Sequence, residues 1–157
     1  MSARATRGVR LALVTLSALL LAACSAASTA SPSTSTPVTA SPAGSGAPVA
    51  VTLKEFSITV SGQASPGNVS FQVTNKGTMI HEFDIYKSQL PLDKLPINGS
   101  QQVDEGNPAV DTIEASEPIA AGATVNIVAR LAAGHYYIVC NQPGHYSLGM
   151  RLDLVVG

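Results

Sequence analysis

The chain has 157 residues, with nine Lys or Arg against ten Asp or Glu, and a formal net charge of −1. Only 12% of the residues are charged. A chain with so few basic residues lacks the positive surface that nucleic-acid binding requires, so we exclude nucleic acid as a partner.

Residues 1–23 have the pattern of an export signal. Arg4, Arg7 and Arg10 precede an apolar run from Leu11 to Leu21, and two alanines follow. A basic start, a short apolar stretch and small residues predict a signal peptide. The run is too short to span a bilayer comfortably as a helix.

The sequence Leu-Ala-Ala-Cys ending at Cys24 resembles the lipobox of bacterial lipoproteins. The resemblance implies cleavage before Cys24 and attachment of lipid to its sulfur. Two lipid chains would hold the protein at the extracytoplasmic face of the cell membrane. The alternative is an ordinary cleaved signal followed by an incidental cysteine.

Residues 24–48 consist almost entirely of Ser, Thr, Ala, Pro and Gly. Such a composition buries too little apolar surface to offset chain entropy, so we expect a disordered, extended tether. Loss of the three signal-segment arginines leaves six basic and ten acidic residues, a net charge of −4. A neutral or basic protein partner suits that charge.

Residues 49–157 are expected to form one domain. Apolar and polar residues alternate in several short segments separated by turn residues, and no long amphipathic helix interrupts them. This pattern predicts an all-β fold, a Greek-key β-sandwich of seven to eight strands. A phase change at Lys54-Glu55 suggests a bulge or a change of strand partner, and a short helix is possible near residues 90–95. The predicted strands are 49–53, 56–60, 69–73, 80–86, 125–131, 135–140 and 149–156.

A thiol, an imidazole and a thioether lie close together near the C-terminus. Cys140, His145 and Met150 are separated by two four-residue gaps, and Pro143-Gly144 bends the loop between the first two. With a distant histidine, His81, these side chains form the ligand set of a trigonal copper site with a weak axial thioether. Zinc is the rival metal, but its structural sites do not need a methionine.

Each of these side chains also has a purely structural explanation. Cys140 and Met150 can be core residues, His81 a hydrogen-bonded core histidine and His145 a surface loop residue. His135 has the opposite strand parity from Cys140, so we expect it at the surface. If Cys24 is lipidated, Cys140 has no disulfide partner. A disulfide between the two is the competing interpretation.

The motif Cys-x-x-Pro-Gly-His-x-x-x-Gly-Met, with Tyr-Tyr-x-x-Cys and an upstream Asn-x-Gly-x-x-x-His, resembles the cupredoxin (blue copper) family. The gaps around His145 are most similar to rusticyanin and auracyanin loops, and less similar to plastocyanin. The resemblance covers about residues 50–157 and implies one copper ion held by His81, Cys140, His145 and Met150.

One residue departs from that pattern. Many cupredoxins follow the first histidine with Asn or Ser, which helps to hold the cysteine loop, whereas this chain has Glu82. Backbone groups, Asn75 or Asn141 are the candidates for that role. Hydrogen bonds to the thiolate tune the reduction potential, so the substitution bears on that potential.

The sequence therefore predicts a membrane-tethered monomer that carries single electrons between extracytoplasmic redox proteins. Pro143, Tyr146 and Leu148 are expected to form an apolar patch for transient partners around His145. The alternative is a copper-binding protein for resistance or delivery. An enzyme would need further copper sites, such as paired His-x-His ligands, which the sequence lacks. A metal-free adhesion module is a weaker possibility.

Overall fold

The computed structural model describes residues 46–157. The predicted signal peptide, Cys24 and almost all of the predicted tether lie outside the described residues. Within 46–157 the chain forms eight strands and one short 3-10 turn. In chain order these are β1 (Val49–Lys54), β2 (Ser57–Ser61), β3 (Gly67–Asn75), β4 (Asp84–Lys87), η1 (Leu92–Lys94), β5 (Asp111–Glu114), β6 (Thr124–Leu131), β7 (Gly134–Val139) and β8 (Arg151–Val156).

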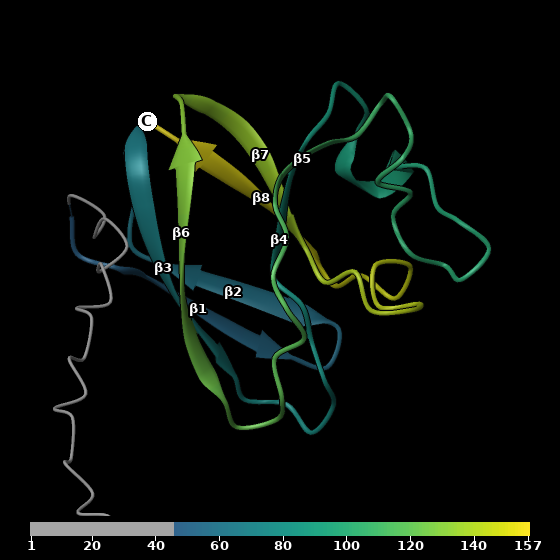
Figure 1. The fold of residues 1–157 in the computed structure, drawn as a ribbon, viewed down its shortest axis with the longest axis horizontal. Coiled ribbons are helices and arrows are strands. Elements are labelled where there is room, and N and C mark those ends of the chain that lie inside the picture. Colours follow the sequence, from purple (N-terminus) through teal and green to yellow (C-terminus); the bar gives the residue numbers. More distant parts are fainter. Residues whose placement is uncertain (1–45) are drawn as a thin grey trace, which may run out of the picture. The chain divides into compact units, whose positions relative to one another are not determined.

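The strands form two four-stranded sheets (Figure 1). One sheet has the order β2-β1-β3-β6 and the other has the order β5-β4-β7-β8. Neighbouring strands are antiparallel except β1 and β3, which run parallel. The chain passes from one sheet to the other after β3, β5 and β6. The predicted all-β sandwich is confirmed.

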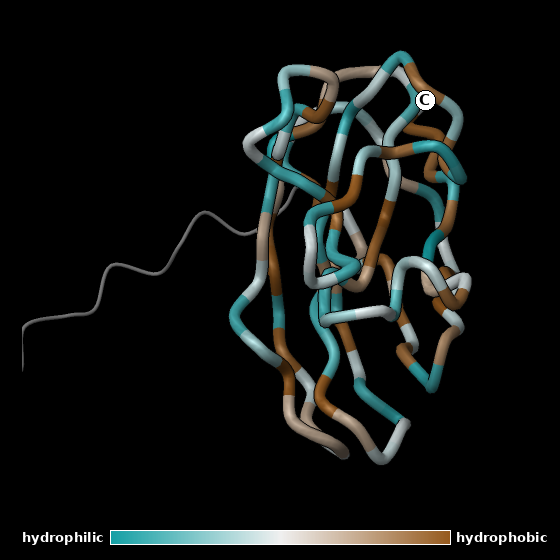
Figure 2. The backbone as a smooth tube through the Cα atoms, turned by 90° about the vertical axis from the view of Figure 1, so that its right-hand side faces the viewer, coloured by the Kyte–Doolittle hydropathy of each residue, from teal (hydrophilic) through white to brown (hydrophobic). Residues whose placement is uncertain are grey.

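Alternating side chains fill the space between the sheets. Val49, Val51 and Leu53 of β1 are buried, and the intervening residues are more exposed. Figure 2 shows hydrophobic and hydrophilic residues alternating along the strands. Phe71 of β3 and Phe83, which precedes β4, meet with ring centroids 5.2 Å apart. Each such buried side chain contributes about 1.5–3 kcal/mol of hydrophobic stabilisation, so this core holds the two sheets together.

The apolar–polar alternation changes phase near Lys54 because the chain reverses direction there. Lys54 pairs with Ser57, which leaves Glu55 and Phe56 as a two-residue turn between the antiparallel strands β1 and β2. Phe56 has φ of 57°, a left-handed conformation that tight hairpin turns use. The prediction of a bulge or a changed strand partner is wrong. The alternation shifts because two turn residues interrupt it.

The region around His81 is less regular than predicted. β4 begins at Asp84, and His81 forms an isolated antiparallel bridge with Ile119. Two backbone hydrogen bonds of 3.2 and 2.8 Å join them. β5 is absent from the sequence prediction because its four residues carry a single apolar side chain, Ile113.

The long connection between β4 and β5 covers the other face of the second sheet. Its predicted short helix is the single 3-10 turn η1. In Figure 1 this connection lies beside the loop between β7 and β8. A second hydrophobic cluster, separate from the core between the sheets, joins the two segments. Its buried members are Tyr86, Leu95, Val103, Val110, Val139 and Tyr146.

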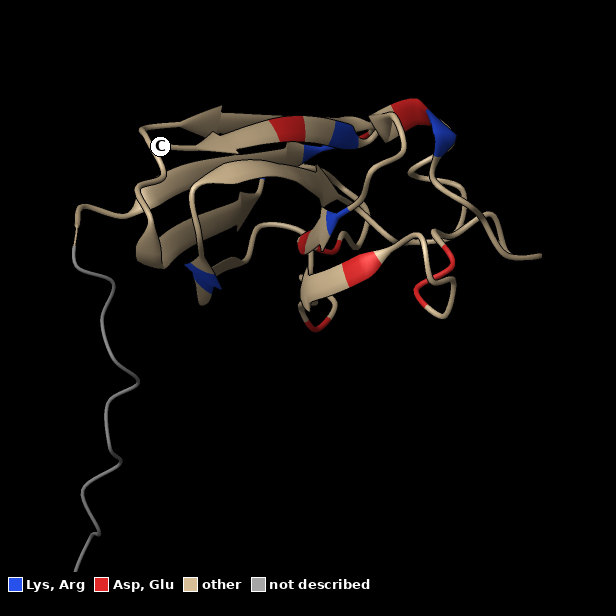
Figure 3. Ribbon diagram, turned by 90° about the horizontal axis from the view of Figure 1, so that it is seen from above, with Lys and Arg blue, Asp and Glu red and all other residues tan. Residues whose placement is uncertain are grey.

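Charged residues are spread over the domain. Figure 3 shows the Lys and Arg positions separated from one another along the ribbon, with no continuous basic band among the described residues. No helix within residues 46–157 combines the length and hydrophobicity needed to cross a membrane.

Asn75, at the end of β3, holds the segment that leads to His81. Its buried side-chain amide donates hydrogen bonds to the carbonyls of Met79 (2.8 Å) and Ile119 (2.9 Å). Its side-chain oxygen accepts one from the N–H of Gly77 (2.9 Å). Because Ile119 also pairs with His81, one side chain fixes both segments of that bridge.

We expect Asn75→Ala to lower the free energy of unfolding by about 3 kcal/mol, since three hydrogen bonds are lost and two carbonyls lose a partner. Urea denaturation of the metal-free protein measures this loss. Thr74→Ala is the matched control, because Thr74 makes only an exposed hydroxyl contact with Thr124. Equal losses in the two variants would contradict this role of Asn75.

Candidate metal centre

Three of the predicted ligands meet in the interior. His81, Cys140 and His145 are all buried and form the one group of this kind among the described residues. The Nδ1 atoms of the two histidines are 3.2 Å apart. The sulfur of Cys140 lies 3.7 Å from Nδ1 of His81 and 3.3 Å from Nδ1 of His145.

The triangle formed by these three atoms has the size of a metal site. A point in its plane lies about 2.0 Å from each atom, and metal–imidazole bonds are about 2.0–2.1 Å long, with metal–thiolate bonds slightly longer. One thiolate and two imidazoles in a plane are the equatorial ligands of a blue-copper site. The residues present therefore fit copper.

Met150, the predicted axial ligand, is fully buried and belongs to the same core cluster as Cys140. Backbone hydrogen bonds tie it to both loop ligands. The N–H of Cys140 donates to the carbonyl of Met150 (3.1 Å), and the N–H of Met150 donates to the carbonyl of His145 (3.0 Å). The loop thus closes on itself, and Gly144, with φ of 81°, supplies the left-handed residue in its bend.

Glu82 holds the cysteine loop in two ways. Its backbone N–H donates to the sulfur of Cys140 at 3.3 Å. Its side-chain carboxylate accepts a hydrogen bond from the amide of Gln142 at 2.7 Å. Of the candidates that the sequence offered, the backbone makes the contact with sulfur. A donor to the sulfur stabilises the thiolate and tunes a bound metal.

Asn141 connects the cysteine loop to the β4–β5 connection. Its side-chain oxygen accepts a hydrogen bond from the N–H of Val103 (2.6 Å), and its amide donates to the carbonyl of the same residue (3.3 Å). The amide of Gln102 donates to the carbonyl of Asn141 (2.7 Å), and the N–H of Gly144 donates to the carbonyl of Gln101 (3.2 Å). This segment therefore supports the ligand loop from outside.

Tyr146 does not belong to an exposed patch. Its ring is 4% exposed and is part of the second hydrophobic cluster. Its hydroxyl donates to the carbonyl of Leu92 (2.7 Å) and accepts from the N–H of Leu95 (3.0 Å). The prediction for Tyr146 is wrong, because the β4–β5 connection covers the side of the loop to which this ring points. Pro143 and Leu148 are exposed as predicted.

Burial sets the protonation of the ligands. It lowers the pKa of His81 and of His145, and His145 lowers that of His81 further. Both imidazoles are therefore neutral near pH 7, which is the form that binds metals. Burial also raises the pKa of the Cys140 thiol to about 11, despite N–H groups of Glu82 and Gln142 that favour the thiolate. Metal binding must release this proton.

The β1–β2 turn contacts both histidines. The carboxylate of Glu55 lies 4.0 Å from Nε2 of His81, and the ring of Phe56 meets that of His145 edge-on with centroids 5.3 Å apart. Sequence reasoning missed both residues. The only signal was the phase change at Lys54-Glu55, which marks a turn without indicating what the turn contacts.

The other histidine and methionine of the domain fall outside the triangle. His135 is exposed, with Nδ1 3.9 Å from a carboxylate oxygen of Asp153, in agreement with its predicted surface position. Met79 is 45% exposed, so it does not pack in the interior beneath the site.

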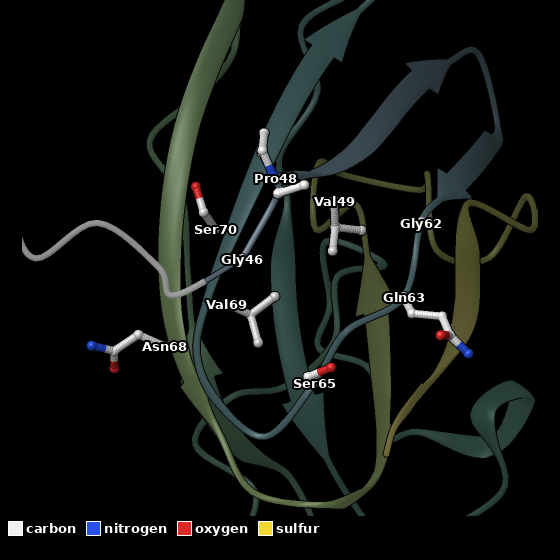
Figure 4. A pocket seen from close by; sticks show the side chains of 10 residues that line it. Gly46, Pro48, Val49, Gly62, Gln63, Ser65, Asn68, Val69 and Ser70 are labelled. Carbon is white, nitrogen blue, oxygen red and sulfur yellow. The ribbon is translucent and has the colours of Figure 1, made fainter.

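A surface hollow of about 320 Å³ lies at the opposite end of β1 from the Glu55–Phe56 turn (Figure 4). We exclude it as the functional site because none of its lining residues ionises or binds metals strongly. They are Gly46, Ala47, Pro48, Val49, Gly62, Gln63, Ser65, Asn68, Val69 and Ser70.

Solved blue copper structures share this fold. The chain is similar to a dithionite-reduced auracyanin from Roseiflexus castenholzii, at 17% identity and a TM-score of 0.50, over 69% of this chain and 94% of the other. It is similar to auracyanin B at 18% identity and a TM-score of 0.50, over 69% and 87%. A rusticyanin structure matches at 24% identity and a TM-score of 0.50, over 73% and 80%. The comparison with curated protein sequences gives no match.

The fold and the four side chains define a cupredoxin, a type-1 copper protein. His81, Cys140, His145 and Met150 are arranged as a type-1 copper site, and copper is the cofactor. The sulfocyanin (SoxE) domain matches residues 57–157, more than half of the sequence. The chain belongs to the sulfocyanin family. Its fold and site support a blue copper electron carrier.

Asp84 is a buried acid close to the site. One of its carboxylate oxygens accepts a hydrogen bond from the N–H of Ser116 (3.0 Å), and the other faces the hydroxyl of Tyr86 (3.4 Å). That hydroxyl donates more closely to Glu105 (2.9 Å). Burial raises the pKa of Asp84 to about 7, and the carboxylates of Glu82 and Glu105 add to this.

We expect Asp84→Asn to remove a pH dependence of stability. Between the unfolded pKa of 3.8 and the folded value of about 7, the folded state binds the Asp84 proton more tightly, so this residue lowers stability as the pH rises. The free energy of unfolding of Asp84→Asn minus that of the wild type should therefore increase by about 1 kcal/mol for each pH unit across that window.

Urea denaturation of the metal-free protein at several pH values from 4.5 to 7 measures this difference. Comparing the two proteins at each pH cancels the titration of the histidines. A difference that stays constant with pH would contradict a raised pKa at Asp84.

Proposed function

We propose that this chain is a membrane-tethered cupredoxin that carries single electrons between extracytoplasmic redox proteins. The observation that supports the electron-transfer role best is the buried triangle of two imidazole nitrogens and one sulfur, held by hydrogen bonds from several segments. When bound there, copper cycles between Cu(I) and Cu(II) and so accepts and donates one electron. The protein's part is to keep the ligands in place.

The ligand positions are fixed independently of the metal. The N–H of Glu82 contacts the sulfur, Asn75 holds the segment before His81, and Asn141 anchors the loop after the cysteine. A site that moves little when the charge changes favours fast electron transfer. Among residues 46–157 this is the one group of potential metal ligands of this kind, which supports a carrier rather than a multicopper enzyme.

Exposed apolar side chains surround the histidines and suit brief contacts with partner proteins. Phe56 contacts the ring of His145, and the backbone N–H of Met79 donates a hydrogen bond to Glu55, which lies beside His81. A small apolar surface of this kind favours complexes that form and dissociate quickly. We propose that a monomer presents this surface to its redox partners. Its exposed members are Phe56, Met79, Ile80, Pro143 and Leu148.

We expect the purified protein loaded with Cu(II) to be strongly coloured, to lose the colour on reduction and to show a reversible one-electron couple. Optical and paramagnetic-resonance spectra with a redox titration measure this. Cys140→Ser should lose the colour, because the sulfur makes the short covalent bond to copper. His135→Ala is the control and should keep it, since His135 lies at the surface.

Colour that persists in Cys140→Ser would contradict the copper assignment. A copper protein without a reversible couple would instead support storage or delivery of copper.

Membrane attachment is a separate proposal that depends on Cys24. We expect the full chain expressed in a bacterium to incorporate labelled fatty acid and to sediment with membranes. Cys24→Ser should remove both properties, because the sulfur is the predicted attachment point, whereas Ser25→Ala should keep them. Fractionation with fatty-acid labelling measures this, and an unlabelled, soluble wild-type protein would contradict lipidation.

A further inference from the structure

Glu55 is the charged side chain closest to the outer nitrogen of a predicted copper ligand. Its carboxylate accepts hydrogen bonds from the N–H of Thr78, from the hydroxyl of Thr78 (3.1 Å) and from the N–H of Met79 (3.0 Å). These bonds lower its pKa to about 2, so the carboxylate carries a full negative charge near neutral pH. The same bonds hold it in one position beside His81.

Nε2 of His81 has no other partner. The imidazole directs Nδ1 to the triangle, and Nε2 is a buried atom without a hydrogen bond. When Nδ1 binds a metal, Nε2 carries the ring proton and is a donor. Metal-bound histidines usually direct that proton to a carboxylate or a carbonyl. Here the carboxylate of Glu55 lies 4.0 Å from Nε2.

Gly77 has no side chain, which leaves space for the Glu55 carboxylate to lie beside Nε2 of His81. A Cβ atom at Gly77 would lie 2.6 Å from a carboxylate oxygen of Glu55 and 2.9 Å from Nε2 of His81. Both distances are shorter than atoms tolerate, so any side chain at this position would push the carboxylate and the imidazole apart. The backbone of Gly77 is itself held by the side chain of Asn75.

We propose that Glu55 is a positioning residue of the copper centre, whose carboxylate interacts electrostatically with the Nε2–H of copper-bound His81 and lowers the reduction potential. This inference rests on the proposed function. At 4.0 Å the contact is a charge–dipole interaction rather than a hydrogen bond. A fixed negative charge stabilises Cu(II) more than Cu(I), because Cu(II) carries one more positive charge, so the potential falls.

The test compares three copper-loaded proteins by redox titration: the wild type, Glu55→Gln and Asp111→Asn. Glutamine retains an oxygen that can accept the hydrogen bonds of Thr78 and Met79, and removes only the charge. Asp111 is exposed and lies opposite Lys87 in the antiparallel β4–β5 pairing, at the end of β4 away from His81. Asp111→Asn therefore removes one charge from a position away from His81. We expect the potential to rise in Glu55→Gln and to stay near the wild-type value in Asp111→Asn, with the colour kept in all three.

Glu55→Asp provides a second measurement if the glutamine variant is unstable. It keeps the charge on a shorter side chain, so its potential should lie closer to the wild-type value than that of any neutral substitution. A coloured wild type whose potential does not change in Glu55→Gln, or changes equally in Asp111→Asn, would overturn the role of Glu55. A colourless, redox-inactive wild type would instead overturn the proposed function.

Discussion

The structure of this domain depends on burying one thiol and two imidazoles within 3.7 Å of one another. Three polar groups placed so closely in an apolar interior are unfavourable unless other contacts hold them there. In the metal-free state, burial keeps the thiol protonated and the imidazoles neutral, which limits that cost. The three ligands are therefore already close together before a metal ion binds. Copper binding displaces the thiol proton and interacts more strongly with the sulfur than the proton did.

Contacts from several segments of the chain fix the positions of the ligands. The sandwich supplies Cys140 just after β7 and Met150 just before β8, while His81 lies outside regular strands and pairs with Ile119. Side chains complete the support, since Asn75 and Asn141 each bond to backbone groups of other segments. These contacts come from the protein alone, so they hold the ligand segments in place without a metal ion.

Charge around the site is unevenly distributed. Glu55, Glu82 and Asp84 are all near the ligands, but their environments differ. Backbone N–H groups hold Glu55 as an anion, whereas burial raises the pKa of Glu82 and of Asp84. Hydrogen bonding thus lowers the pKa of one of these acids, and burial raises the pKa of the other two.

The sequence by itself determined the fold class and the set of copper-binding side chains. Strand alternation and the spacing from Cys140 to Met150 are local properties, which a short stretch of chain fixes. Only the tertiary structure decided that Tyr146 is covered and that the Glu55–Phe56 turn contacts both histidines. Those contacts join residues 26 to 89 positions apart, and the packing of whole segments produces them. The periodicity of a strand specifies which face of it is buried, but not which loop will cover the end of the sandwich.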